Sequence, residues 1–191
     1  MWKRNYLRGG GAAAFLLMLA ACSSDLNTSF LRPSEPIELV LFDLLTAPID
    51  RQSGLTLVSA RGTGVPRAIR LDQTDEWDVA FALVDDDAVW LPRGFFESLD
   101  PTSGILAMDG GFDAIERVPR DRSLYEMADP VTVTVGRVYA IRSRTDPTLS
   151  LPCHIFGKLV VDDIEGTPAR MTIRVLWNPN CDDTNVTPEN R

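Results

Sequence analysis

The stretch CHIFGKLVVDDIEGTPARMTIRVLWNPNC, which runs from Cys153 to Cys181, contains the clearest strand pattern in this chain. Two runs in which apolar residues alternate flank the sequence Glu165-Gly166-Thr167-Pro168. Glycine permits a positive φ and proline cannot continue a hydrogen-bonded ladder, so these four residues indicate a turn between two strands. Alternation with period two predicts strands that bury one face. The first strand has Ile155, Gly157, Leu159 and Val161 on one face and Phe156, Lys158 and Val160 on the other. In the second strand the expected inner face is Met171, Ile173, Val175 and Trp177. Antiparallel pairing would bring the two cysteines close enough for a disulfide.

The N-terminus has the pattern of an export signal. Residues 1–8 are basic, with Lys3, Arg4 and Arg8, and residues 12–19 are apolar but shorter than the roughly 20 residues that span a membrane. The following Leu19-Ala20-Ala21-Cys22 resembles the lipobox of bacterial lipoproteins. In that family the signal peptide, here residues 1–21, is removed and the cysteine carries the lipid. The resemblance implies a membrane anchor at Cys22, and an ordinary signal peptide is the alternative.

Two further features of the export region bear on location and on the cysteines. The residue after the cysteine is Ser23 and not an aspartate. In this respect the sequence resembles lipoproteins that are delivered to the outer membrane. With Cys22 assigned to the lipid, two of the three cysteines remain, and an even remainder in an oxidising compartment predicts one disulfide, Cys153–Cys181. This loop length corresponds to about 3–4 kcal/mol of stabilisation. A pair of metal thiolates is disfavoured because the chain has one histidine and no CxxC motif.

The charge balance argues against nucleic-acid binding. The formal net charge of the 191 residues is −8, and without residues 1–21 the chain has 16 basic and 27 acidic residues. Such a surface repels phosphate backbones. We expect a lipidated tether over residues 22–36, one β domain over 37–181 and a polar tail over 182–191.

Short strand candidates separated by glycine, proline and aspartate turns fill the β domain, and no long amphipathic helix is evident. This pattern predicts an all-β fold, a single antiparallel sandwich or barrel-like domain with little helix. Besides the hairpin, the expected strands are 37–45, 55–60, 68–71, 77–83, 88–91, 131–135 and 138–142. In 77–83 the alternation places Trp77, Val79, Phe81 and Leu83 on the core face and Asp78, Ala80 and Ala82 on the other. Phe95 and Phe96 are expected in the core, and residues 98–111 as a loop.

Three segments together resemble the HmuY-like bacterial lipoproteins. They are Trp77-Asp78-Val79-Ala80-Phe81, then Val138-Tyr139-Ala140-Ile141-Arg142-Ser143, and then Phe156-Gly157-Lys158-Leu159 followed by a last strand that ends in Asn178-Pro179-Asn180. The resemblance covers about half of the mature chain. It implies an all-β protein, and the well-known members bind haem through axial histidine or methionine side chains.

This resemblance implies haem as a possible cofactor, but the candidate ligands are few. His154 is the only histidine, lies beside Cys153, and is expected to be a surface or structural residue. Met108 and Met127 lie in the irregular middle region and are the candidate axial ligands. Packing in the core is the alternative for both.

No motif in the sequence indicates catalysis. The chain has no G-x-S-x-G, HExxH, P-loop or GxGxxG pattern. We therefore expect a non-enzymatic lipoprotein of the bacterial envelope, anchored to the outer membrane, that binds a small ligand. The alternative is a structural lipoprotein that contacts another envelope protein and has no small ligand. An envelope hydrolase is a third, weaker hypothesis.

Overall fold

The computed structural model describes residues 32–58, 65–145 and 153–189 as two antiparallel sheets of five strands each. The part of the chain so described contains no α-helix and three 3₁₀ turns, Arg93–Phe95, Phe112–Ala114 and Arg122–Leu124. This confirms the all-β prediction. The strands are β1 (Ile37–Phe42), β2 (Gly54–Thr56), β3 (Arg67–Ile69), β4 (Val79–Val84), β5 (Asp87–Pro92), β6 (Gly104–Met108), β7 (Val131–Thr132), β8 (Val138–Arg142), β9 (Phe156–Glu165) and β10 (Arg170–Asn178).

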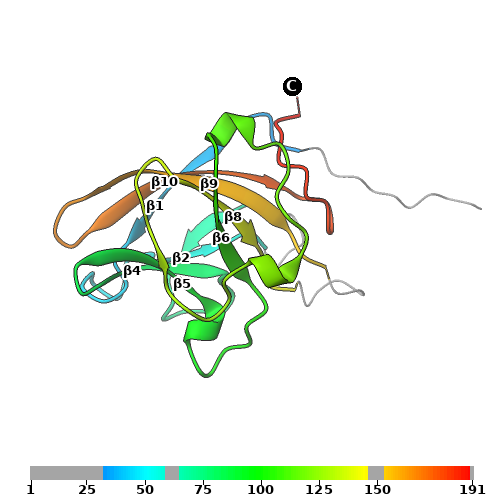
Figure 1. Ribbon diagram of the computed structural model, residues 1–191. Helices are drawn as coiled ribbons and strands as arrows, with labels where there is room; N and C mark the ends of the chain where they lie inside the picture. Colours follow the sequence, from blue (N-terminus) through cyan, green and yellow to red (C-terminus); the bar gives the residue numbers. More distant parts are fainter. Residues whose placement is uncertain (1–31, 59–64, 146–152, 190–191) are drawn as a thin grey trace, which may run out of the picture.

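The two sheets stack as layers, with the long β9–β10 hairpin lying over β2, β4 and β5 (Figure 1). One sheet, called the β9 sheet below, has the order β1-β10-β9-β8-β6, and the other, the β4 sheet, has the order β3-β2-β4-β5-β7. The hairpin turn is where the sequence predicted it, and Gly166 there has a φ of +85°. The segment 98–111 was expected to be a loop, but residues 104–108 form β6, which pairs along its whole length with β8. A five-residue edge strand between Gly and Asp residues is too short to give a clear alternation.

A central core fills the space between the sheets. From β10 it takes Met171, Ile173, Val175 and Trp177, all buried, which confirms the predicted inner face of that strand. From the β4 sheet it takes Val79, Phe81 and Trp90, all fully buried. Each such side chain stabilises the fold by about 1.5–3 kcal/mol.

β9 was expected to bury one face, and this expectation is wrong for residues 156–161, where both faces are buried, whereas residues 162–165 are exposed or only partly buried. Phe156 and Val160 point away from the central core and pack in a second cluster. The irregular segment between β6 and β7 and the C-terminal residues cover them, so the alternation along β9 could not reveal that its second face is also enclosed. We call this group the β9-side cluster: Ile115, Val118, Tyr125, Val138, Ala140, Phe156, Val160 and Val186.

The outer face of the β4 sheet has a smaller cluster, which we call the β4-side cluster. It contains Trp77, Ala80, Ala82, Val89 and Leu91. Trp77 was expected on the core face with Val79 and Phe81, but it packs with the alanines on the opposite face. The reason is that β4 begins only at Val79, so the strand alternation does not extend back to residue 77.

Two other expectations about apolar residues need correction. Phe95 was expected in the core and is 45% exposed, because it lies in a 3₁₀ turn at the surface, whereas Phe96 is partly buried against the β4-side cluster. The strand expected over 131–135 is limited to Val131 and Thr132, and Val135 is 52% exposed just before the turn at Gly136. The strand ends at Thr132 because the chain approaches the turn at Gly136.

The predicted Cys153–Cys181 disulfide is present, with a Cα–Cα distance of 5.4 Å. Beyond it, the segment expected as a polar tail packs on the domain, where Val186 is fully buried. The two ends of the described chain lie side by side, and Arg32 donates hydrogen bonds to Thr187 and Glu189. Cys22, the signal peptide and most of the tether lie outside the described residues. No helix in the described ranges has the length and apolarity needed to cross a membrane.

Candidate functional site

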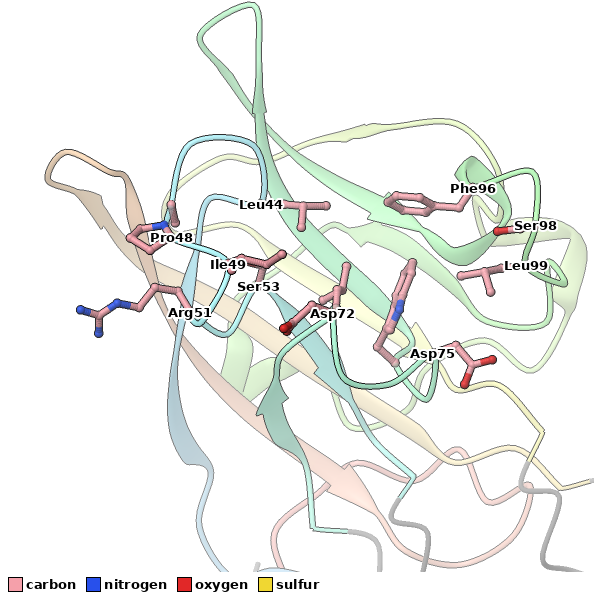
Figure 2. Close-up of a pocket in the computed structure, with 13 residues that line it drawn as sticks. Leu44, Pro48, Ile49, Arg51, Ser53, Asp72, Asp75, Phe96, Ser98 and Leu99 are labelled. Atoms are coloured by element: carbon pink, nitrogen blue, oxygen red, sulfur yellow. The ribbon is translucent and has the colours of Figure 1, made fainter.

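A cavity of about 520 Å³ opens on the outer side of the β4 sheet. Its size is in the range of small-molecule sites, about 300–1,000 Å³. Three connecting segments build it: the β1–β2 loop, the β3–β4 loop and the residues after the first 3₁₀ turn (Figure 2). The lining consists of Leu44, Ala47, Pro48, Ile49, Arg51, Ser53, Leu71, Asp72, Asp75, Trp77, Phe96, Ser98 and Leu99.

The base of this cavity is aromatic and aliphatic. Trp77 is 2% exposed and meets Phe96 edge to face, with 5.1 Å between the ring centroids. Leu44 and Phe96 point toward one another across the cavity (Figure 2). Leu44, Leu71 and Leu99 are only partly buried although they pack on the β4-side cluster. An apolar surface that the fold leaves incompletely covered is therefore available to a ligand.

A buried carboxylate holds the β1–β2 loop that forms one wall of the cavity. Asp43, fully buried, accepts hydrogen bonds from the backbone N–H groups of Leu45 and Thr46 and from the Thr46 hydroxyl. It also accepts one from the N–H of Leu83 in β4 at 2.8 Å. The loop is thus attached to the sheet by side-chain hydrogen bonds. An aspartate directly after an apolar strand and three residues before a threonine was the available sequence signal.

The rim of the cavity is polar. The Asp72 carboxylate takes two hydrogen bonds from Arg70, at 2.6 and 3.0 Å, and this pairing holds the pKa of Asp72 below its ordinary value. Arg51 lies over the Phe42 ring at 5.1 Å, and its guanidinium points away from the cavity in Figure 2. Asp75 is exposed, and within the described ranges its carboxylate accepts no hydrogen bond.

Arg93 supports the base of the cavity from inside the protein. Its Nη1 donates to the carbonyl oxygens of Asp75 and Trp77, and its guanidinium lies 5.5 Å from the centroid of the Trp77 ring. Burial lowers the pKa of this guanidinium. The arginine therefore fixes the backbone on which Trp77 is carried, rather than facing a ligand.

A second polar cluster lies deeper, beside the start of β4. Asp78 is fully buried and accepts hydrogen bonds from the backbone N–H groups of Leu57 at 2.6 Å and Arg144 at 2.7 Å. The Arg144 guanidinium is 3.5 Å away and also donates to Thr56 at 2.9 Å. Burial raises the pKa of Asp78, and Arg144 opposes this. The cluster ties three segments together, because Asp78 holds the backbone of both Leu57 and Arg144.

Met108 and Met127 are partly buried and pack against the β9-side cluster, and neither lines the large cavity. Met108 lies in β6, and the Met127 sulfur accepts a hydrogen bond from Arg122 at 3.1 Å. Both side chains are thus used in packing, and an axial role for either stays a prediction. The residues that line the large cavity include no His, Met, Cys or Tyr, so a haem would find no axial ligand there.

His154 lies beside the disulfide and is held by its neighbours. Its Nδ1 contacts the carbonyl oxygen of Ser143 at 2.8 Å and its Nε2 contacts Arg142 Nη2 at 2.5 Å. Because a guanidinium only donates, Nε2 is the acceptor and Nδ1 carries the proton. The neutral imidazole therefore joins β8 to the start of β9.

A smaller, polar cavity of about 310 Å³ lies near the C-terminal segment. Lys158 of β9 lines it, and its ammonium donates to the carbonyl oxygens of Phe112 and Ile115 at 2.7 and 2.6 Å. The same ammonium lies 4.7 Å from the Phe112 ring centroid. This lysine fastens the covering segment to β9. In the described part of the chain, no group of three or more His, Cys, Asp or Glu residues is arranged to hold a metal ion.

The sequence predicted none of the residues of the large cavity as site residues. Trp77 was expected to be a core residue, and it is both buried and part of the lining. The loop residues have no pattern of their own, since three separate connections supply them. Comparison with protein-family models, with curated proteins and with solved structures found no match to this chain.

Proposed function

We propose that the protein is a non-enzymatic envelope lipoprotein that binds a small, largely apolar ligand in the large cavity. The observation that carries this proposal is the 520 Å³ space whose base is Trp77, Phe96 and partly exposed leucines. The lipid anchor at Cys22, the outer-membrane location and the relationship to HmuY-like lipoproteins are parts of the same proposal that rest on the sequence. Haem belongs to it only through that resemblance.

The character of the lining supports binding over catalysis. The base offers apolar surface, and the polar groups at the rim are two carboxylates, two hydroxyls and one guanidinium. Carboxylates at an open rim can orient a ligand, but they have neither burial nor a neighbouring base to activate a nucleophile. Small-molecule sites commonly combine an apolar body with a few polar groups that fix orientation.

The test is calorimetric titration of the full chain in lipid nanodiscs with 1-naphthalenemethanol, a neutral aromatic probe. Ala47→Trp places an indole into the cavity and is expected to abolish saturable binding, and Ser98→Trp is a second variant with the same purpose. Ala114→Trp is the matched control, because Ala114 is exposed in a 3₁₀ turn away from the cavity. Non-saturable heat that is equal in all four proteins would overturn the proposal.

A second candidate function has one observation in its favour. Leu45 and Ile49, at the edge of the cavity, are 63% and 76% exposed. Exposed apolar side chains within one loop are typical of a contact surface for another protein. Under this alternative the protein is structural and the partner is another envelope protein.

Photo-crosslinking in intact cells distinguishes the two functions. A photoreactive amino acid at position 49 should give one discrete adduct if a partner covers this loop. The control position is Val135, which is 52% exposed on a different turn. Equal or diffuse adducts at both positions would contradict the partner hypothesis and leave ligand binding as the remaining function.

A further inference from the structure

The mouth of the large cavity is strongly acidic. The segments that form it, residues 44–53, 70–77 and 95–100, contain six acidic and two basic residues. The acidic residues are Asp50, Asp72, Asp75, Glu76, Glu97 and Asp100, and the basic ones are Arg51 and Arg70. The local potential therefore favours a positive over a negative group at the entrance.

The arginines near this mouth already have partners. Arg70 is paired with Asp72, and Arg51 lies on the Phe42 ring with its guanidinium directed away from the cavity (Figure 2). Arg93 is buried and donates to backbone carbonyl oxygens beneath Trp77. None of the three presents a guanidinium to an anionic ligand in the cavity, and a carboxylate that entered would lose its water without gaining a cation.

Asp75 differs from the other acidic lining residue, Asp72. The Asp72 carboxylate is compensated by Arg70, whereas the Asp75 carboxylate accepts no hydrogen bond from any residue that the structure describes. Asp75 and Leu99 both belong to the lining of the cavity, and their side chains lie well apart in Figure 2. The buried Arg93 interacts with Asp75 through charge, but no described residue donates a hydrogen bond to the Asp75 carboxylate. A ligand whose apolar body sits over Trp77 thus has one carboxylate in the lining that is open to a hydrogen bond.

We propose that the cavity binds amphipathic ligands that combine an aromatic or aliphatic body with a cationic amine, and that Asp75 receives the amine. The inference rests on the proposed function and specifies its ligand class. Charge complementarity at the rim sets the preference, and the apolar base provides most of the affinity. Because the rim is exposed, the preference is a matter of a few-fold in affinity and decreases as salt is added.

The test compares three probes with the same aromatic body on the full chain in nanodiscs of zwitterionic lipid. These are 1-naphthylmethylamine, 1-naphthalenemethanol and 1-naphthylacetate, measured by calorimetry at low and high ionic strength. We expect the amine to bind most tightly and the carboxylate most weakly. Asp75→Asn should weaken amine binding by about two- to fivefold, the size expected for an exposed ion pair, and should leave the alcohol unchanged. The matched control is Asp109→Asn, since Asp109 is fully exposed at the end of β6 on the other sheet.

Each outcome decides one question. Binding of all three probes with equal affinity, or tighter binding of the carboxylate, would overturn the charge preference and leave the ligand cavity intact. An equal loss of amine affinity in Asp75→Asn and Asp109→Asn would show that only net charge acts, and would contradict the role of Asp75. No saturable binding of any probe would contradict both this inference and the proposed function.

Discussion

The outer faces of the two sheets carry similar apolar side chains but are covered to different degrees. On the β9 sheet, Ile115, Val118 and Val186 from the covering segments are all buried, with at most 7% of each residue exposed. On the β4 sheet, Leu44, Leu71 and Leu99 lie over Ala80 and Ala82 but are only partly buried. The cavity occupies the space that these leucines leave unfilled.

This difference indicates that one outer face of the sandwich contributes mainly to stability and the other mainly to binding. A cover whose side chains are fully buried contributes the transfer free energy of those side chains to stability. Segments that do not pack fully on the sheet, such as those around the cavity, contribute less of that free energy and leave apolar surface accessible to a ligand. We therefore expect changes on the β9 side to affect stability most, and changes on the β4 side to affect binding most.

The largest expected effect comes from a pair of aromatic truncations. Phe156→Ala removes a side chain that is 1% exposed and should lower the free energy of unfolding by about 3–5 kcal/mol. Phe96→Ala removes a partly buried ring at the cavity and should cost only about 1–2 kcal/mol. Urea denaturation of the full chain measures both, and equal costs would contradict the difference between the two covers.

The disulfide is expected to have the next largest effect, because it joins the start of β9 to the C-terminal segment that covers that sheet. Replacing Cys153 and Cys181 together by serine opens a link with a sequence separation of 28 residues. The chain-entropy model gives a loss of about 3–4 kcal/mol. The neutral probe should still bind with unchanged affinity to the folded fraction. A weakened affinity at equal folded fraction would show that the β4-side cavity depends on the β9-side cover.

The difference between the two outer faces also explains which parts of the fold could be predicted from the sequence. The hairpin, its inner face on β10 and its disulfide were predictable because regular alternation, a glycine turn and paired cysteines are local signals. The second buried face of β9 was not, because Val118 and Val186 cover it from segments with no regular pattern. Period-two alternation reports which residues share a face, and it does not report what lies over that face.

The cavity was still less accessible to sequence analysis. Its lining comes from three connections that approach one another only in the folded chain, and Trp77 belongs to it because β4 begins two residues later. Asp43 was not predicted as a site residue from the sequence. Its fourfold acceptor role depends on the position of Leu83, forty residues away, which no local pattern encodes.

Lys158 and Asp43 each hold a covering segment on one of the two sheets. Substituting them tests whether stability and binding can be changed separately. Lys158→Met leaves the carbonyl oxygens of Phe112 and Ile115 without this donor and should cost about 1–3 kcal/mol of stability, with no change in probe affinity. Asp43→Ala removes the acceptor of the β1–β2 loop and should cost a similar free energy while also weakening probe binding severalfold.

The control for the second substitution is Asp43→Asn, which keeps a side-chain oxygen and should retain part of the binding. Denaturation and calorimetry on the same samples separate the two readouts. If Lys158→Met weakened the probe as much as Asp43→Ala, the two outer faces would not act independently.

The smallest expected effect is a pH dependence confined to the disulfide end. Burial is the main cause that lowers the pKa of His154 below its ordinary value, and nearby Arg142 acts in the same direction. The unfolded chain therefore takes up a proton at a higher pH than the folded chain does. By linkage, the stability that neutral His154 contributes is complete above about pH 6.5 and decreases as the pH falls below it.

His154→Gln tests this directly, because the chain contains no other histidine. The wild type should lose stability between pH 7.5 and 5.5 relative to the variant, since Asp78 and the other titrating groups are present in both proteins and cancel in the difference. Urea denaturation at several pH values measures it, and parallel pH profiles would contradict the role of His154. Binding of the neutral probe should not change over this range, because the lining of the large cavity contains no histidine. A probe affinity that followed the His154 titration would mean that the disulfide end and the cavity are coupled, which the separate covers of the two sheets do not predict.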